Sequence, residues 1–190
     1  MTCEQHREQW EKSLESGLLG VSPRAVQLSR YRWLTTDQSQ QAAFPDYMIL
    51  PLTPFAKGLD GSWLGWIRQG DATRCPMVLA PRDEEFASVI GESFADAIFW
   101  MLVDELKNCW LSASDEGNTV WRLRQWLPGL NALLEESQFS ALKRISNGAP
   151  SLTQEGSTTF ISSTELQTLM WTYPFLEYDG LTRIRQYAHL

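Results

Sequence analysis

Histidine is scarce in this sequence, and its placement does not favour catalysis. The two histidines are His6 and His189, which lie near opposite ends of the chain. Histidine is the usual proton carrier near neutral pH, so acid–base chemistry commonly places one in a reaction centre. We expect both residues to lie at the surface, near mobile termini.

Cysteine is also scarce, since Cys3, Cys75 and Cys109 are odd in number and far apart in the chain. Zinc sites need clustered cysteines and histidines at short spacing, and disulfide frameworks usually show a denser, even set. We therefore expect no metal site, no disulfide framework and a reducing compartment. Cys75 and Cys109 have apolar neighbours in the sequence, which favours a place in the core as small apolar residues.

Other absences narrow the function further. The sequence has no glycine-rich phosphate-binding motif, no Gly-x-Ser-x-Gly elbow and no EF-hand loop, so we predict neither an enzyme nor a bound cofactor. It has no run of about eighteen apolar residues, and its first dozen residues are polar and charged. These features predict no membrane span and no signal peptide, and we expect a cytoplasmic protein.

Basic residues are outnumbered, and the formal net charge is −7. This charge disfavours binding to nucleic acid or to anionic membrane surfaces. Between Arg82 and Glu105, seven acids oppose one base. If the apolar side of a helix here is buried, Asp96 and Asp104 lie on an outer acidic face that attracts a basic protein partner, and the alternative is a solubilising surface. The run from Asp83 to Glu85 indicates solvated acids rather than a catalytic pair.

Large aromatic residues, in contrast, are abundant. The chain has nine Trp and eight Phe, and 43% of its residues are hydrophobic, which predicts an aromatic-rich core. Trp63 and Trp66 are three positions apart in a predicted strand, so they cannot share one of its faces, because side chains alternate. One of the two is therefore exposed, as an anchor for a partner, or is covered by another layer.

Hydrophobic periodicity predicts a single domain with strands as well as helices, in which the wide apolar stripe of one helix packs against a sheet. The clearest helix follows Ser93, where a Ser93–Asp96 capping box precedes apolar residues at every fourth position up to Leu106. The other predicted elements before residue 150 are a hairpin of Trp63–Arg68 and Met77–Ala80, a helix at Glu4–Leu19, a loop at Thr35–Asp46, a strand at Tyr47–Leu52, and helices at Thr119–Leu127 and Leu130–Ile145 split by Pro128-Gly129.

A boundary at Asn147–Pro150 divides the chain. We expect residues 1–150 to form the α/β core and residues 151–190 to form an extension packed on it. The extension is predicted to contain a strand at Thr158–Ile161, a helix from Ser162 to Tyr173, and a strand or exposed edge at Leu181–Tyr187.

Two stretches resemble the type VI secretion-associated TagF (ImpM) family. Residues 10–18, WEKSLESGL, are similar to the family's helix pattern of Trp-acid-x-x-Leu-Gln-x-Gly-Leu. WLGWIRQGDATRCPMVLA, which starts at Trp63, is similar to its central segment, where Trp-x-Gly leads to an Asp, an Arg and Pro-Leu-x-Leu. The likeness covers roughly the first 110 residues and lacks the family's N-terminal Gly-Lys-Leu-Pro segment.

This resemblance implies an α/β (α+β) fold, with a mixed, largely antiparallel sheet flanked by helices in a single domain. It also implies a non-catalytic accessory protein of a type VI secretion machine. Members of the family act after translation to hold secretion in check, through contact with a forkhead-associated scaffold protein. Trp63, Asp71 and Arg74 are then candidate protein-binding residues, and Asp71 and Arg74 form a polar pair at the hairpin tip that shapes it or touches the partner. A turn Asp and a surface Arg are the alternative.

The central strands also resemble the SMI1/KNR4-like immunity family. GSWLGWIRQG and CPMVLA precede VIGESFADAIFWML, as the strands of that fold lead into an apolar helix. This resemblance implies an acidic immunity protein that binds and neutralises a toxin. It accounts for the acid-rich helix, but leaves about eighty C-terminal residues without a place.

Overall fold

The computed structural model describes residues 2–22, 24–28, 30–44, 48–68, 75–107, 116–148, 151–152, 158–173 and 183–185. The side chains of residues 116–121, 151–152, 158 and 183–185 are not part of this description. Asp71, Arg74, Cys109 and His189 therefore lie outside the described residues, as does most of the predicted Leu181–Tyr187 strand.

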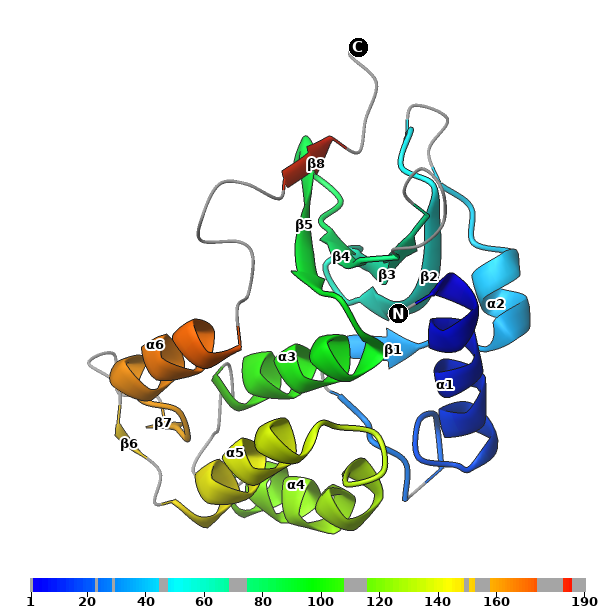
Figure 1. Cartoon of the computed structure of the whole chain (residues 1–190). Coiled ribbons are helices and arrows are strands. Elements are labelled where there is room, and N and C mark those ends of the chain that lie inside the picture. The colour runs from blue at the N-terminus through cyan, green and yellow to red at the C-terminus, as the bar shows by residue number, and fades with distance from the viewer. Residues whose placement is uncertain are drawn as a thin grey trace.

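A curved sheet of six strands forms one layer of the molecule (Figure 1). Its strands, in spatial order, are β1 (Tyr31–Trp33), β2 (Leu52–Gly58), β3 (Trp63–Ile67), β4 (Met77–Ala80), β5 (Phe86–Gly91) and β8 (Arg183–Arg185). Every pairing among these described strands is antiparallel. The predicted α+β class and the central hairpin are thereby confirmed.

Helices make up the remaining layers. They are α1 (Cys3–Glu15), α2 (Thr36–Gln40), α3 (Phe94–Lys107), α4 (Glu116–Leu130), α5 (Glu136–Asn147) and α6 (Ser163–Thr172), and a small pair of strands, β6 (Ser151–Leu152) and β7 (Thr158–Thr159), precedes α6. Figure 1 shows α3 beneath the sheet, α4 and α5 below α3, and α6 beside its C-terminal end. In the described part of the chain, no helix combines the length and hydropathy that crossing a bilayer requires.

Helix α3 lies at the centre of the fold rather than at its surface. Eleven of its fourteen residues are buried, including Glu105, so only Asp96, Asp104 and Lys107 retain substantial exposure. Of the acids expected on an outer face of this helix, Glu105 is buried, whereas Asp96 and Asp104 keep partial exposure. The acids from Asp83 to Glu85 are exposed, as predicted, but they lie in the connection from β4 to β5.

Two predicted elements near the start of the sheet are wrong. The segment Thr35–Asp46 was expected to be a loop, but it contains α2, which begins with a capping box between Thr35 and Gln38. A strand was predicted at Tyr47–Leu52, but the strand in this region, β2, begins only at Leu52 and continues past Pro54. The register of β2 against β3 shifts around Phe55, so this strand accommodates its proline beside a bulge.

The helices depart from their predicted ends in two places. Helix α1 was expected to reach Leu19 but stops at Glu15. Gly17 follows with a positive φ of 71°, the left-handed conformation that commonly ends a helix. Helix α4 was expected to break at Pro128 but continues to Leu130. The proline lies in the last turn of α4, so the helix loses one hydrogen bond there and ends soon afterwards.

Aromatic side chains hold the sheet to the helices. Phe55 is fully buried and contacts three rings, with centroid distances of 6.2 Å to Trp33, 6.0 Å to Trp66 and 5.2 Å to Phe94 at the start of α3. Trp66 shares this face of the sheet, whereas Trp63 points to the other face, as the alternation of side chains predicts.

Candidate functional site

The predicted site residues do not converge on one place. Asp71 and Arg74 lie outside the described residues. Trp63 is half-buried on the face of the sheet opposite α3, where its ring meets Phe44 at 5.3 Å and the Lys57 ammonium lies 4.4 Å from its centroid. The sequence predicted that one of Trp63 and Trp66 would be exposed or would be covered by another layer. Trp63 is covered in part, by the Phe44 ring and the Lys57 ammonium.

Asp96 has a structural role that the capping-box prediction anticipated. Its Oδ2 accepts hydrogen bonds from the backbone N–H groups of Glu92 and Ser93, at 3.1 and 3.0 Å, and the Ser93 hydroxyl accepts one from the Asp96 N–H. Its Oδ1 accepts a 2.7 Å bond from the Gln138 amide of α5. This carboxylate therefore caps α3 and joins it to α5.

Asp104 lies at the edge of a pocket. Its Oδ2 accepts hydrogen bonds from the Arg30 guanidinium at 3.0 Å and from the Tyr31 hydroxyl at 3.3 Å. Burial, followed by the negative charge of Asp104, raises the pKa of Tyr31 above its ordinary value, so the phenol remains a hydrogen-bond donor. These three residues join the C-terminal half of α3 to the first strand of the sheet.

The pocket beside Asp104 has a volume of about 260 Å³ and lies between the sheet, α3 and α6. Its wall is mainly apolar, and the residues that line it are Tyr31, Leu64, Leu79, Ile90, Trp100, Met101, Val103, Asp104, Lys107, Leu166 and Met170. A concave apolar surface with a few polar groups at its edge is typical of binding sites for other molecules. We call it the α3–α6 pocket.

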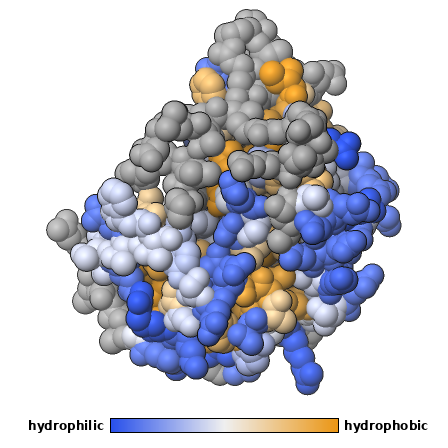
Figure 2. All heavy atoms as spheres, in the orientation of Figure 1, coloured by the Kyte–Doolittle hydropathy of each residue, from blue (hydrophilic) through white to orange (hydrophobic). Residues whose placement is uncertain are grey.

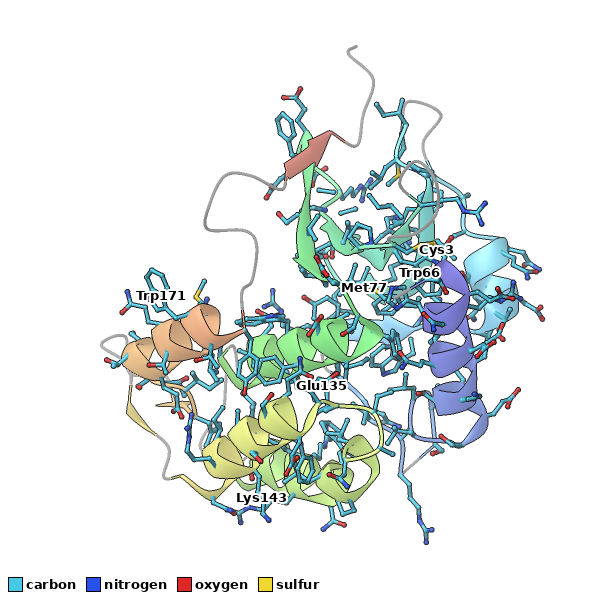
Figure 3. All side chains as sticks on the ribbon, in the orientation of Figure 1. Cys3, Trp66, Met77, Glu135, Lys143 and Trp171 are labelled. Atoms are coloured by element: carbon cyan, nitrogen blue, oxygen red, sulfur yellow. A yellow bond between two sulfur atoms is a disulfide. The ribbon has the colours of Figure 1, made fainter. Side chains whose placement is uncertain are left out.

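Two exposed side chains lie on the helices that form the α3–α6 pocket, and one of them, Lys107, belongs to its lining. Lys107 is exposed at the end of α3, and no ion-pair partner for it exists among the described residues. Trp171 follows Met170 on α6 and is 85% exposed, and Figure 3 shows its side chain pointing away from the helix. Figure 2 shows hydrophobic residues at the surface in the middle of this face of the molecule, with hydrophilic side chains around them.

Helix α1 forms a second cluster of chemically distinctive side chains. His6 is fully buried, which contradicts its expected place at the surface, and its Nε2 forms a 2.9 Å hydrogen bond with the carbonyl oxygen of Cys75. Cys3 and Cys75 form a disulfide, with their Cα atoms 5.2 Å apart, whereas the sequence predicted no disulfide framework. Cys75 is buried, as predicted.

A helical pattern was the available signal for this cluster. Cys3, His6 and Trp10 recur at spacings of three and four, which places them on one face of α1. Trp10 is buried against Trp66, with an edge-to-face centroid distance of 5.9 Å. A polar residue inside an otherwise apolar helix face indicates burial with a partner, and this outweighs its position near the end of the chain.

Acidification is expected to destabilise the protein through His6. Burial lowers the pKa of His6 below 6.5, although the bond with Cys75 opposes the shift. The unfolded chain therefore binds a proton more readily, and the contribution of neutral His6 is complete above pH 6.5 and is lost as the pH falls toward the folded pKa. Denaturant unfolding between pH 6.5 and 5.5 should show a loss of up to about 1.4 kcal/mol per pH unit. The same slope in His6→Gln would contradict this assignment.

Neither a metal-binding cluster nor a matching protein points to a more specific function for this site. Among the described residues, no group of three or more His, Cys, Asp or Glu side chains is arranged to hold a metal ion. No protein-family model, curated protein or solved structure matches the chain.

Proposed function

We propose that this chain is a non-catalytic protein that acts by binding another protein, and that the α3–α6 pocket receives an anchor side chain of that partner. The pocket is the observation that carries the proposal. Its walls are apolar, and the Asp104–Tyr31–Arg30 network and the Lys107 ammonium lie at its edge. Binding energy at protein interfaces concentrates where an aliphatic or aromatic anchor fills such a pocket and polar groups surround it.

Trp171 supports this assignment. Tryptophan is enriched among the residues that dominate protein interfaces, because it covers a large area with few rotatable bonds. Here it is exposed on α6, next to a residue of the pocket wall. Trp171 is thus an exposed aromatic contact on α6, the helix that supplies Leu166 and Met170 to the pocket wall.

A type VI secretion scaffold is the first candidate partner. The TagF resemblance rests on two stretches, and they pack against each other through Trp10 and Trp66, while His6 and Cys75 add a hydrogen bond nearby. The resemblance thus lies on a single structural unit. In this candidate function the chain is a cytoplasmic accessory protein that represses secretion by binding a forkhead-associated scaffold protein.

A toxin is the second candidate partner, and the order of the elements favours it. Strands β2 to β5 follow one another as neighbours and lead into α3, the order that the SMI1/KNR4-like resemblance implies. The C-terminal residues that this resemblance left without a place also contribute to the fold. Leu123 of α4, Leu142 of α5 and Leu169 of α6 belong to the same buried cluster as α3. In this candidate function the chain neutralises a toxin by occupying its surface.

Capture of the partner from the native host separates the two candidates. We expect the immobilised full-length chain to retain one protein in near-stoichiometric amount, identified by mass spectrometry. A forkhead-associated scaffold would support the first candidate, and a toxin domain encoded beside this chain would support the second. An unrelated acidic protein of similar net charge is the control. Retention of the same proteins by that control would contradict specific binding.

A further inference from the structure

We propose that Cys3 and Cys75 form a thiol–disulfide exchange site that reacts with small disulfides of the glutathione class. Cys3 is half-buried at the first turn of α1, whereas Cys75 is only 2% exposed just before β4. The two cysteines therefore differ in access to solvent. This asymmetry assigns Cys3 as the thiol that meets the incoming disulfide, and Cys75 as the thiol that completes the bond inside the protein.

The position of Cys3 favours its reactive form. It follows the N-cap residue Thr2, so its thiol lies at the positive end of the thirteen-residue helix α1. A helix N-terminus stabilises the thiolate, which is the nucleophile in disulfide exchange. His6 keeps Cys75 near this end of α1, because its ring holds the Cys75 carbonyl oxygen at 2.9 Å.

Space for a small disulfide exists beside Cys3. A groove of about 740 Å³ runs between α1 and strands β2 and β3, and its lining residues are Cys3, Glu4, Arg7, Glu8, Glu11, Thr53, Trp66 and Arg68. Figure 3 shows Cys3 and Trp66 near each other where α1 meets the sheet. Arg7 is paired with Glu11, which leaves Arg68 as the exposed cation available to a glutathione carboxylate.

The reaction is a two-electron exchange between thiols and a disulfide. The Cys3 thiolate attacks one sulfur of oxidised glutathione, forms a mixed disulfide and releases one glutathione thiolate. The Cys75 thiolate then attacks the Cys3 sulfur and releases the second glutathione. Two protein thiols are oxidised, one glutathione disulfide is reduced, and the two protons of the protein thiols pass to the two glutathione thiolates. Oxidation joins α1 covalently to Cys75, which lies two residues before β4. In a reducing compartment an excess of reduced glutathione reverses the link.

Single-cysteine replacements test the assignment of the two thiols. Reduced, full-length Cys75→Ser should form a glutathione adduct on Cys3 when mixed with oxidised glutathione. Cys3→Ser should form one on Cys75 at least about tenfold more slowly, because burial limits access to that thiol. Mass mapping of the adducts against time measures both rates. Equal rates, or adducts confined to Cys109, would overturn the proposal.

Charge reversal gives a second test that leaves both cysteines in place. In the reduced wild-type background, Arg68→Glu should slow formation of the Cys3–Cys75 bond by oxidised glutathione several-fold, and leave its formation by neutral hydroxyethyl disulfide unchanged. Arg24→Glu makes the same charge change at an exposed residue that does not line the groove. An equal effect of both variants, or an equal effect of Arg68→Glu on both disulfides, would refute a glutathione-class site.

Discussion

Replacement of Phe55 by alanine is expected to lower the free energy of unfolding by about 3–5 kcal/mol. The side chain is fully buried and contacts Trp33, Trp66 and Phe94, which come from β1, β3 and α3. Removal of the ring leaves a cavity among three rigid aromatic groups that cannot collapse to fill it. A loss of this size is a large fraction of the total stability of a typical domain. Denaturant unfolding at neutral pH measures it.

Phe55→Leu is the matched control for this substitution. Leucine restores most of the volume, so its cost should stay below about 1.5 kcal/mol. Near-equal losses for the alanine and leucine variants would show that ring contacts, rather than cavity formation, determine the effect. A loss below about 1 kcal/mol for Phe55→Ala would contradict the central position of this residue in the core.

Gly65→Ala is expected to cost about 3 kcal/mol, which is large for the addition of one methyl group. A Cβ atom at this position would lie 2.3 Å from the carbonyl oxygen and 2.8 Å from the carbonyl carbon of Thr53. Both are backbone atoms of the neighbouring strand β2, so relief of the overlap must separate β2 from β3. The Trp-x-Gly pattern therefore has a physical basis here, since only glycine permits this approach of the two strands.

Gly129→Ala is the control for Gly65→Ala. Its Cβ would meet the Leu18 Cδ1 atom at 2.6 Å, but that atom is the end of a flexible side chain and can move aside. Alanine also has a higher helix propensity than glycine, so we expect a change of less than about 1 kcal/mol in either direction. Thermal unfolding of the two variants side by side gives the comparison. Equal stability of both variants would contradict the close approach at Gly65.

Strong periodic patterns were sufficient to predict the centre of this fold. The repeat of apolar residues at every fourth position predicted α3, and the capping box located its first turn, because both signals depend on local geometry alone. Two short strand candidates joined by a turn-like connector predicted the β3–β4 hairpin, which is also a local signal. Helix α2 has no comparable apolar pattern. Its capping box between Thr35 and Gln38 is a local signal that the prediction missed. The bond from the Ser39 hydroxyl to the Pro54 carbonyl oxygen joins residues far apart in the chain, so it cannot be predicted from a short window.

The candidate site was less accessible to prediction from the sequence. Asp104 was expected to meet a partner from an exposed helix face, and it lies instead at the edge of a pocket, bonded to Arg30 and Tyr31. The pocket combines residues of β1, β3, β4, β5, α3 and α6, and some of these residues are more than a hundred positions apart in the chain. Its apolar residues resemble ordinary core residues in the sequence, and only their arrangement in the fold leaves a hollow beside α6.

The affinity of the captured partner for two α6 variants tests protein binding through the α3–α6 pocket most directly. Leu166→Arg places a long charged side chain in the pocket wall, whereas Gln167→Arg makes the same addition at the next, exposed position outside the wall. Thermal unfolding first verifies that both variants are folded. Calorimetry should then show a Kd at least tenfold higher for Leu166→Arg, equivalent to about 1.4 kcal/mol. The Kd of Gln167→Arg should stay within about twofold of the wild-type value. Wild-type affinity in Leu166→Arg would contradict the proposed role of the pocket.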